Sequence, residues 1–216
     1  MTEKQAPDAQ LLLATGCAHC PVVLEGLTQL LKQGKIGRLE AINIVEHPEA
    51  AQEAGTRSVP WTRIGEFELE GALSPKELAR WVELAGDEAG FSEYYSHLLE
   101  SQRAHQVIAL IKKRPKTLSK LIDLLKSDAT PMAARIGVGV VIEALEGNDI
   151  LHQILPDLTA LTRSEEPNVR ADAAHFLGVT RHPAAAEPLK PLLSDSHPDV
   201  REIAADSLEM LQSEEN

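Results

Sequence analysis

Short apolar runs alternate with amphipathic stretches over roughly the first 85 residues of the chain. Apolar side chains are continuous or alternate in Leu11–Thr15 and Leu39–Val45, whereas they recur at helical spacing in Cys20–Lys32 and His47–Ala54. Runs of the first kind are typical of strands, and runs of the second kind are typical of helices. This part of the chain therefore predicts strand, helix, strand, helix.

Two further strands and a capped helix are predicted next. Trp61–Ile64 and Phe67–Glu70 are separated by a Gly-Glu pair, which favours a tight turn between two strands. Ser74-Pro75 then precedes the amphipathic stretch Lys76–Leu84, with serine as N-cap and proline at the first helical position. The predicted order over residues 10–86 is βαβαββα.

From Gly86 onward the pattern is helical throughout, and the chain repeats itself. The same residue types recur 31 positions apart at Leu158, Leu161, Pro167, Val169, Arg170, Ala173, Ala174 and Leu177 and then at Leu189, Leu192, Pro198, Val200, Arg201, Ala204, Ala205 and Leu208. A less regular copy lies 36 residues upstream of the first, at Ile122, Leu125, Pro131, Gly137, Val138 and Val141. Each unit is interpreted as two antiparallel helices, with proline starting the second.

A helix pair cannot bury its apolar face alone, so about three stacked units are needed for stability. The segment Phe91–Arg114 is expected either to cap one end of the stack or to dock on the first domain. Because 216 residues leave room for two domains of roughly 100 residues each, we divide the chain into residues 1–87 and 88–216. The predicted linker is Gly86–Gly90.

The charge balance is acidic in both halves. The formal net charge is -12, with 8 basic against 13 acidic residues in 1–87 and 13 against 20 in 88–216. Neither half offers the basic surface that holds a phosphate backbone, so we expect no nucleic-acid partner and no membrane partner. Met1–Asp8 is polar and Leu11–Ala14 is shorter than the apolar stretch of about 7 to 15 residues in a signal peptide. No later run would span a membrane, and we expect a cytoplasmic protein.

The only two cysteines, Cys17 and Cys20, lie in Gly16–Pro21, between the first predicted strand and the first predicted helix. Where thiols are kept reduced, such a pair is more often catalytic or metal-binding than structural. The chain has no second Cys-x-x-Cys and no histidine pair at ligand spacing. A redox pair is therefore favoured over a metal half-site or inert thiols, and we expect neither a metal nor a cofactor.

Three features make residues 10–86 similar to a thioredoxin or glutaredoxin domain. Gly16–Pro21 resembles the active-site turn, Ser58–Trp61 stands at the place of the family's cis-proline loop, and Gly71–Ser74 leads into Trp81-Val82. The helical units resemble the short form of HEAT repeat, of the bilin-lyase type. The resemblance implies an α/β thioredoxin-like domain followed by an all-α domain of HEAT-like repeats.

The spacing of the cysteines suits thiol chemistry. A free thiol with a pKa of about 8.5 is mostly protonated at neutral pH, so the site must stabilise a thiolate. The start of a helix offers Cys17 unpaired N–H groups and the positive end of the dipole, and Cys20, one turn later, can donate its S–H. Protonated His19 would favour the thiolate further, which makes the disulfide a stronger oxidant. Pro21 suits the first helical turn because it has no N–H.

The resemblance implies that Cys17 is nucleophilic and Cys20 resolving, and that Val59, Pro60 and Trp61 face an extended substrate. Two positions depart from the thioredoxin pattern. Leu11 stands where thioredoxins carry a buried acid, and Gly16 stands where many carry tryptophan. Deprotonation of Cys20 and general substrate docking are the steps that these departures affect.

The favoured function is a thiol-disulfide oxidoreductase that acts on protein disulfides or thiols. A thiol reductant or oxidant recycles the dithiol, and the HEAT-like domain binds a protein partner or substrate. The alternative is a non-catalytic adaptor or a redox-sensing module for protein interaction. The sequence leaves the direction of the reaction open, because it depends on the reduction potential and on the recycling partner.

The remaining motifs are interpreted as structural. Gly137–Val141 lacks the third glycine of a dinucleotide site and lies inside a helical repeat, so it predicts close helix packing. Lys112–Arg114 fits cations at a helix C-terminus, and Arg170 and Arg201 are expected to bond acids or carbonyls of an adjacent turn. The scattered histidines form no convincing ligand cluster: His97, His105, His152, His175, His182 and His197.

Overall fold

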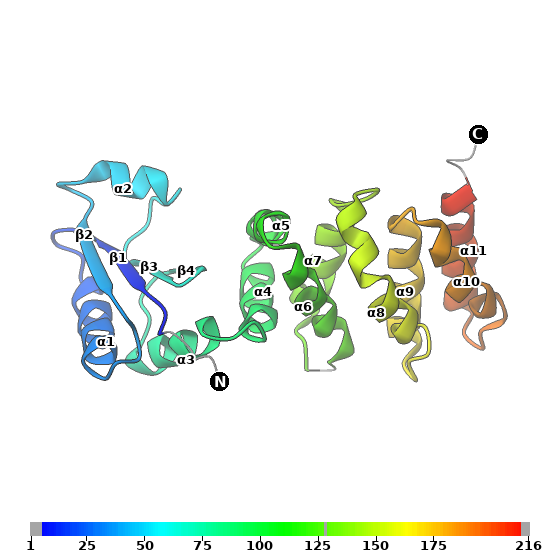
Figure 1. Cartoon of the computed structure of the whole chain (residues 1–216), viewed down its shortest axis with the longest axis horizontal. Coiled ribbons are helices and arrows are strands. Elements are labelled where there is room, and N and C mark those ends of the chain that lie inside the picture. The colour runs from blue at the N-terminus through cyan, green and yellow to red at the C-terminus, as the bar shows by residue number, and fades with distance from the viewer. Residues whose placement is uncertain (1–5, 128, 213–216) are drawn as a thin grey trace. The chain divides into compact units, whose positions relative to one another are not determined.

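The computed structural model describes residues 6–127 and 129–212. The chain forms two compact units, the first ending at Phe91 and the second beginning at Ser92 (Figure 1). The division after residue 87 stays a prediction. Residues 1–5 of the polar stretch Met1–Asp8, which lacks the pattern of a signal peptide, lie outside the described residues.

A four-stranded sheet organises the first unit. Its strands are β1 (Ala9–Leu13), β2 (Leu39–Asn43), β3 (Trp61–Ile64) and β4 (Phe67–Glu70). They lie in the order β2-β1-β3-β4, with β1 and β2 parallel and the other two pairs antiparallel. The parallel pair requires a crossover connection, which the first helix provides.

Three helices complete this unit: α1 (Cys20–Lys32), α2 (Pro48–Glu53) and α3 (Pro75–Ala85). The predicted order βαβαββα is thereby confirmed. Because α1 and α3 touch each other, they cover the same face of the sheet. At Gly26 of α1 an added Cβ would lie 2.6 Å from Leu78 Cδ1 of α3, so glycine allows the two helices to approach closely.

The two faces of the sheet differ in polarity. Leu11, Ile64 and Leu69 are fully buried, and the strand register places them on one face, beneath α1 and α3. On the other face Gln10 donates to Glu40 Oε2 at 2.7 Å. The core of this unit therefore lies between the sheet and the α1–α3 pair, and it extends to the opposite face at Leu12 and Trp61, which pair with each other and are buried.

The α3 helix begins as its sequence predicts. Ser74 Oγ accepts from the Glu77 N–H, and Glu77 Oε2 accepts from the Ser74 N–H at 2.8 Å, which is a complete capping box. These hydrogen bonds lower the pKa of the Glu77 carboxyl. Pro75 occupies the first turn, where its missing N–H leaves no helical bond unmade.

Two predicted strands end earlier in the structure. β1 spans Ala9–Leu13 rather than Leu11–Thr15, because the chain turns at Gly16, where φ is +82°. β2 stops at Asn43 rather than Val45. There the Asn43 side-chain oxygen accepts the Val45 N–H at 3.1 Å and closes a turn. Apolar residues of the turns had extended the pattern beyond the true strand ends.

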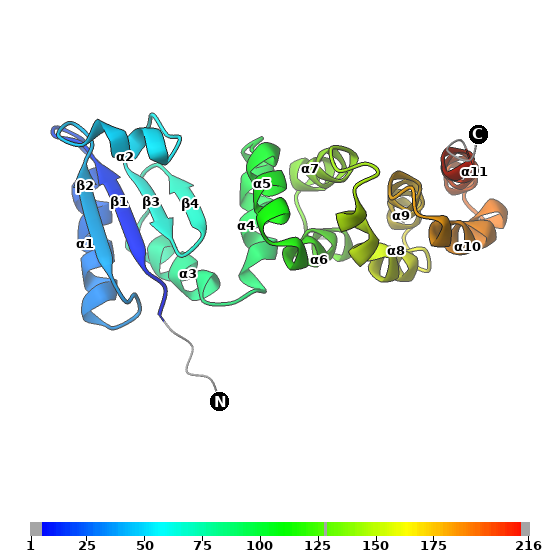
Figure 2. The same ribbon diagram turned by 45° about the horizontal axis from the view of Figure 1, so that its top comes forward.

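The second unit consists of helices stacked in two layers. Figure 2 shows α5, α7, α9 and α11 in one layer and α6, α8 and α10 in the other. The helices of this unit are α4 (Gly90–Glu100), α5 (Ala104–Lys113), α6 (Leu118–Ile122), α7 (Met132–Glu143), α8 (Leu155–Leu161), α9 (Pro167–Val179), α10 (Ala186–Leu189) and α11 (Pro198–Gln212). None of the described helices combines the length and apolarity that a membrane span requires.

The 31-residue offset is a repeat of structure. Pro167 and Pro198 start α9 and α11, and the equivalent Ala173 and Ala204 are fully buried. The two helices approach closely at Gly178, where an added Cβ would lie 2.9 Å from Ser207 Cβ. Small residues therefore lie where helices of successive units approach closely, as the sequence predicts.

The first helix of each pair is broken. Short 3-10 segments adjoin α6, α8 and α10, at Asp123–Lys126, Asp149–Ile154 and Lys190–Ser194. Pro156 in α8, Pro188 in α10 and Pro191 in Lys190–Ser194 lack the N–H of a continuous α-helix, whereas α6 and Asp123–Lys126 contain no proline. The upstream copy supplies α7, which lies against α4: at Gly137 an added Cβ would lie 2.8 Å from Leu99.

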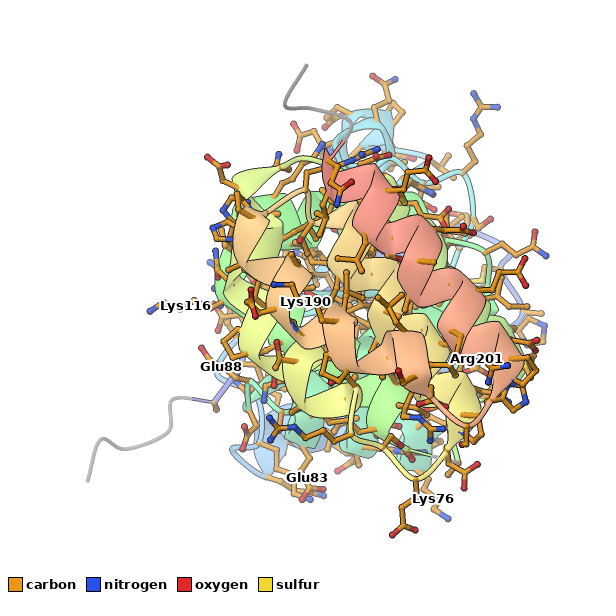
Figure 3. The ribbon with its side chains drawn as sticks, turned by 90° about the vertical axis from the view of Figure 1, so that its right-hand side faces the viewer. Lys76, Glu83, Glu88, Lys116, Lys190 and Arg201 are labelled. Carbon is orange, nitrogen blue, oxygen red and sulfur yellow. A yellow bond between two sulfur atoms is a disulfide. The ribbon has the colours of Figure 1, made fainter. Side chains whose placement is uncertain are left out.

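The repeated arginines bond to the turn that precedes their helix. Arg170 donates to the carbonyls six and five residues earlier, and Arg201 does the same at its own copies of these positions. Figure 3 shows Arg201 beside the amino-terminal part of α11. Arg170 also donates through Nε and Nη2 to both Asp195 carboxylate oxygens, at 2.7 and 2.8 Å. These contacts confirm a structural role for both arginines.

Candidate functional site

Three strand ends meet at one edge of the sheet in the first unit. The parallel strands β1 and β2 end opposite each other, at Leu13 and Asn43. β3 begins at the same edge, because its first residue, Trp61, pairs with Leu12. The turn that leaves β1 and the loop that enters β3 therefore lie beside each other.

The turn after β1 carries the two cysteines, joined as a disulfide. The S–S distance is 2.13 Å and the Cα atoms are 5.6 Å apart. The Cys17 N–H donates to the Ala14 carbonyl at 3.2 Å, and the Cys20 N–H donates to Cys17 Sγ at 3.2 Å. Cys20 is only 4% exposed, whereas Cys17 is half-buried. Cys17 is therefore the sulfur that an incoming group can reach more readily.

His19 and Pro21 flank Cys20 at the start of α1, and both side chains are exposed. His19 occupies the cap position and makes no side-chain capping hydrogen bond, and Pro21 lies in the first turn. The first turn of α1 contains no acidic residue. The positive end of this 13-residue helix therefore faces the cysteine turn without an offsetting carboxylate from its own first turn.

The loop before β3 contains a cis peptide bond between Val59 and Pro60. Pro60 is buried, and its carbonyl accepts the Gly71 N–H at 2.9 Å. Val59 is half-buried and lies beyond the last described β1–β3 pair, so its main chain belongs to the loop. Trp61 is 2% exposed, and Arg63 Cζ lies 5.9 Å from the centre of its ring. Trp61 thus supports the loop from within the domain.

Asn43 is a residue of the site that sequence reasoning missed. Its Nδ2 donates to Thr15 Oγ1 at 3.0 Å and so joins the end of β2 to the cysteine turn. An asparagine directly after an apolar run is a signal of a turn that bonds to its own side chain. Two apolar side chains near these turns are exposed, Val22 in the first turn of α1 and Val45 in the turn after β2.

Comparison with family models agrees with this architecture. Residues 8–83 match the model described as thioredoxin domain, and residues 118–209 match the model described as HEAT repeats. A thioredoxin-like domain precedes HEAT repeats in this chain. No curated protein matches it.

Within the thioredoxin-like domain, Leu11 occupies the position at which thioredoxins carry a buried acid. Leu11 is fully buried under α1 and α3, and it pairs across the ladder with Thr62. The Thr62 hydroxyl is buried and has no hydrogen-bond partner among the residues that the structure describes. A buried carboxylate is therefore not available at this position to take a proton from the resolving cysteine.

The other sequence motifs lie in the HEAT region and serve packing. Gly137 touches a neighbouring helix, as described above, and Lys112 and Lys113 occupy the last turn of α5. His175 Nε2 lies 3.1 Å from Glu143 Oε1. Across residues 6–127 and 129–212 no three His, Cys, Asp or Glu side chains are grouped so that they could hold a metal ion.

Proposed function

We propose that the chain is a thiol-disulfide oxidoreductase in which the thioredoxin-like domain performs the chemistry and the HEAT repeats bind a protein partner or substrate. The observation that carries this proposal is the cysteine pair, bonded across the start of a helix with one sulfur covered and the other accessible. Redox function is what a thioredoxin-like domain with such a pair supports best.

The reaction begins with the reduced pair. The Cys17 thiolate attacks one sulfur of a protein disulfide, a mixed disulfide forms, and the leaving sulfur takes up a proton. Cys20 then loses its proton and attacks Cys17 Sγ, which breaks the mixed disulfide and forms the Cys17–Cys20 bond. The substrate gains two electrons and two protons. A thiol reductant, as in the reducing cytoplasm, restores the pair, and a suitable oxidant drives the same steps in reverse.

The surroundings of the pair assist the first attack. The N-terminus of α1 and protonated His19 both favour the Cys17 thiolate over the thiol. Pro21 lets the helix begin directly after Cys20. On the substrate side, the main chain of the half-buried Val59 is offered to an extended peptide, and the buried Pro60 and Trp61 hold that loop in position.

The HEAT repeats supply selectivity. A partner held on this domain is kept near the dithiol at a high effective concentration, which raises the rate of exchange without any new contact at the sulfur atoms. Substrates would then be chosen by their binding to the repeats rather than by the residues around their disulfide.

A redox-sensing adaptor is the second candidate, and the burial of Leu11 favours it. Without an acid at this position Cys20 must lose its proton to solvent, although it is almost fully covered. Slow resolution would leave the chain bound to a partner through a mixed disulfide. Such a chain would report redox state and would not turn over.

A trapping experiment tests the proposal. Cys20→Ser is expected to stall the mixed disulfide in cell extract, so partners should be bound covalently and released by a reductant. Cys17→Ser, which cannot attack, is the matched control. Partners held equally and noncovalently by both variants would favour the adaptor.

Turnover is measured separately with a generic disulfide substrate. Wild type should reduce it with excess thiol present, and Cys17→Ser should not. Activity that survives Cys17→Ser would contradict the proposed mechanism.

A further inference from the structure

The outer face of α7 is apolar. Met132, Ile136 and Val140 are 70%, 63% and 49% exposed. They are spaced four residues apart, so they form a single stripe along about two turns of the helix, a length of about 12 Å. These three residues, here called the α7 stripe, lie opposite the buried side of the helix, which carries Ala134, Val138 and Val141 among others.

The repeat itself does not require an apolar residue at these positions. By the 36-residue offset Met132 and Ile136 correspond to Asn168 and Asp172 of α9. By the further 31-residue offset these two correspond to Asp199 and Ile203 of α11. Val140 corresponds to Phe176 of α9 and Ser207 of α11. The equivalent positions are therefore mostly polar where the same fold is repeated. Packing between repeats therefore accounts for an apolar residue at Val140, whose equivalent Phe176 is buried, but not for Met132.

A groove of about 360 Å³ lies beside the α7 stripe, between α7 and α9. Its walls include Met132 and Ile136 on one side and Asn168 and Val169 on the other, with Glu166 at the turn before α9. Its volume is that of a cleft for a few side chains rather than for a large ligand. The groove and the stripe together form a continuous surface with apolar anchoring points.

The two charged residues of α7 are already paired with α9. Arg135 Nη2 lies 3.6 Å from Asp172 Oδ2, and Glu143 Oε1 lies 3.1 Å from His175 Nε2. Burial raises the pKa of the Asp172 carboxyl, an effect that Arg135 partly opposes. The surface of α7 thus offers neutral apolar side chains rather than free charge.

The repeats that contain the groove carry a net negative charge. Residues 131–212 contain 13 acidic and 6 basic residues. On α11, in the same layer as α7 and α9 (Figure 2), four exposed acids recur along one side of the helix: Asp199, Glu202, Asp206 and Glu209. Two copies of this chain would bring these like charges together, which disfavours self-association through this face. A cationic partner would instead be attracted to these acids.

We propose that the α7 stripe and the adjoining groove bind a basic amphipathic helix of a partner protein. Its apolar residues at positions i, i+4 and i+7 would lie on the stripe, and its lysines and arginines would face Glu166, at the turn before α9, and the exposed acids of α11. This inference specifies the partner of the HEAT repeats and rests on the proposed function for its use in selecting substrates. Binding of such a helix to this surface can be measured without any redox step.

The test uses the full chain with its disulfide intact and a fluorescein-labelled helical peptide of leucine and lysine, about 18 residues or five turns long. One control peptide carries glutamate in place of lysine, and another has the same composition without amphipathic order. Binding is followed by fluorescence anisotropy at low and high salt. The double variant Met132→Gln, Ile136→Gln removes the anchors, and Leu193→Gln, at an exposed leucine of the 3-10 segment Lys190–Ser194, is the matched control.

The lysine peptide should bind wild type and Leu193→Gln equally, and about tenfold more weakly to the double variant, the change that about 1.4 kcal/mol produces. Its affinity should fall as salt rises. Equal binding to the double variant, equal binding of the glutamate peptide, or no binding of the lysine peptide would overturn the inference. Self-association that Ile136→Gln abolishes would show that a second copy covers the stripe, and would also overturn it.

Reduction of a small disulfide by the same variants separates this inference from the proposed function. If wild type reduces the disulfide but does not bind the peptide, only the proposed docking surface is contradicted. If wild type binds the peptide but does not reduce the disulfide, the oxidoreductase proposal is contradicted and the proposed docking surface is supported.

Discussion

His19 can be changed without disturbing the packing around it, because its side chain is exposed and makes no capping hydrogen bond. We expect His19→Leu to make the disulfide less oxidising by about 30 mV, a tenfold change in the exchange equilibrium, since the imidazole that favours the thiolate when it carries a proton is lost. Equilibration with glutathione measures it. His47→Gln, another exposed histidine at a helix cap of the same domain, is the control. An unchanged or more oxidising potential for His19→Leu would contradict the assigned role.

The Asp195 carboxylate gives the HEAT region a defined pH dependence. Arg170 and the His197 N–H lower the pKa of Asp195 from 3.8 to about 2. The stability that this carboxylate contributes is fully present above its unfolded pKa and is lost as pH falls through the folded value. Asp195→Asn should therefore cost about 2 kcal/mol near neutral pH and very little near pH 2. Urea unfolding of both proteins across this range measures the difference, and a cost that is independent of pH would disprove it.

At the level of elements, two glycines of α7 respond differently to the same substitution. An added Cβ at Gly137 would lie 2.8 Å from Leu99, whereas at Gly139 the nearest atoms, of Phe176, are 3.9 Å away. Gly137→Ala should destabilise the HEAT region by about 1–3 kcal/mol. Gly139→Ala should stabilise it by up to about 1 kcal/mol through helix propensity. Denaturant midpoints followed by circular dichroism test the pair, and equal shifts would show that close approach at Gly137 is unimportant.

Elements were predictable from the sequence to the degree that local chemistry determines them. The capping box of α3 is formed by Ser74 and Glu77, with Pro75 between them. Because these residues are neighbours in the chain, the sequence alone predicts where α3 begins. The end of β2 could not, because it depends on the Asn43 side chain closing a turn and reaching Thr15. The cis bond at Pro60 was expected only from resemblance, since proline permits both isomers and tertiary context selects one.

For the site, the cysteine pair and its place before a helix were visible in the sequence, but its asymmetry was not. The burial of Cys20 depends on the fold of the whole domain. The depth of Trp61 likewise required the sheet register. The spacing of the cysteines along the chain is enough to predict thiol chemistry. The accessibility of each atom can be known only from the folded domain.

At the scale of the whole molecule, the two units can be observed separately. Both tryptophans of the chain, Trp61 and Trp81, lie in the first unit, whereas α5–α11 belong to the second. We expect tryptophan fluorescence and far-ultraviolet circular dichroism to give unfolding transitions that do not coincide. Gly137→Ala should shift the dichroism transition and leave the fluorescence midpoint in place. Superimposable curves for both proteins would show that the chain unfolds as a single cooperative unit.

The unequal cover of the two sulfur atoms has a practical consequence for chemical labelling. Once the disulfide is reduced, a bulky electrophile such as a dye maleimide should modify the half-buried Cys17 and spare Cys20, which is almost fully enclosed. Intact-mass measurement would then show one adduct per chain. A reporter can thus be attached beside the reactive turn of the natural sequence, without engineering a new cysteine or removing either of those present.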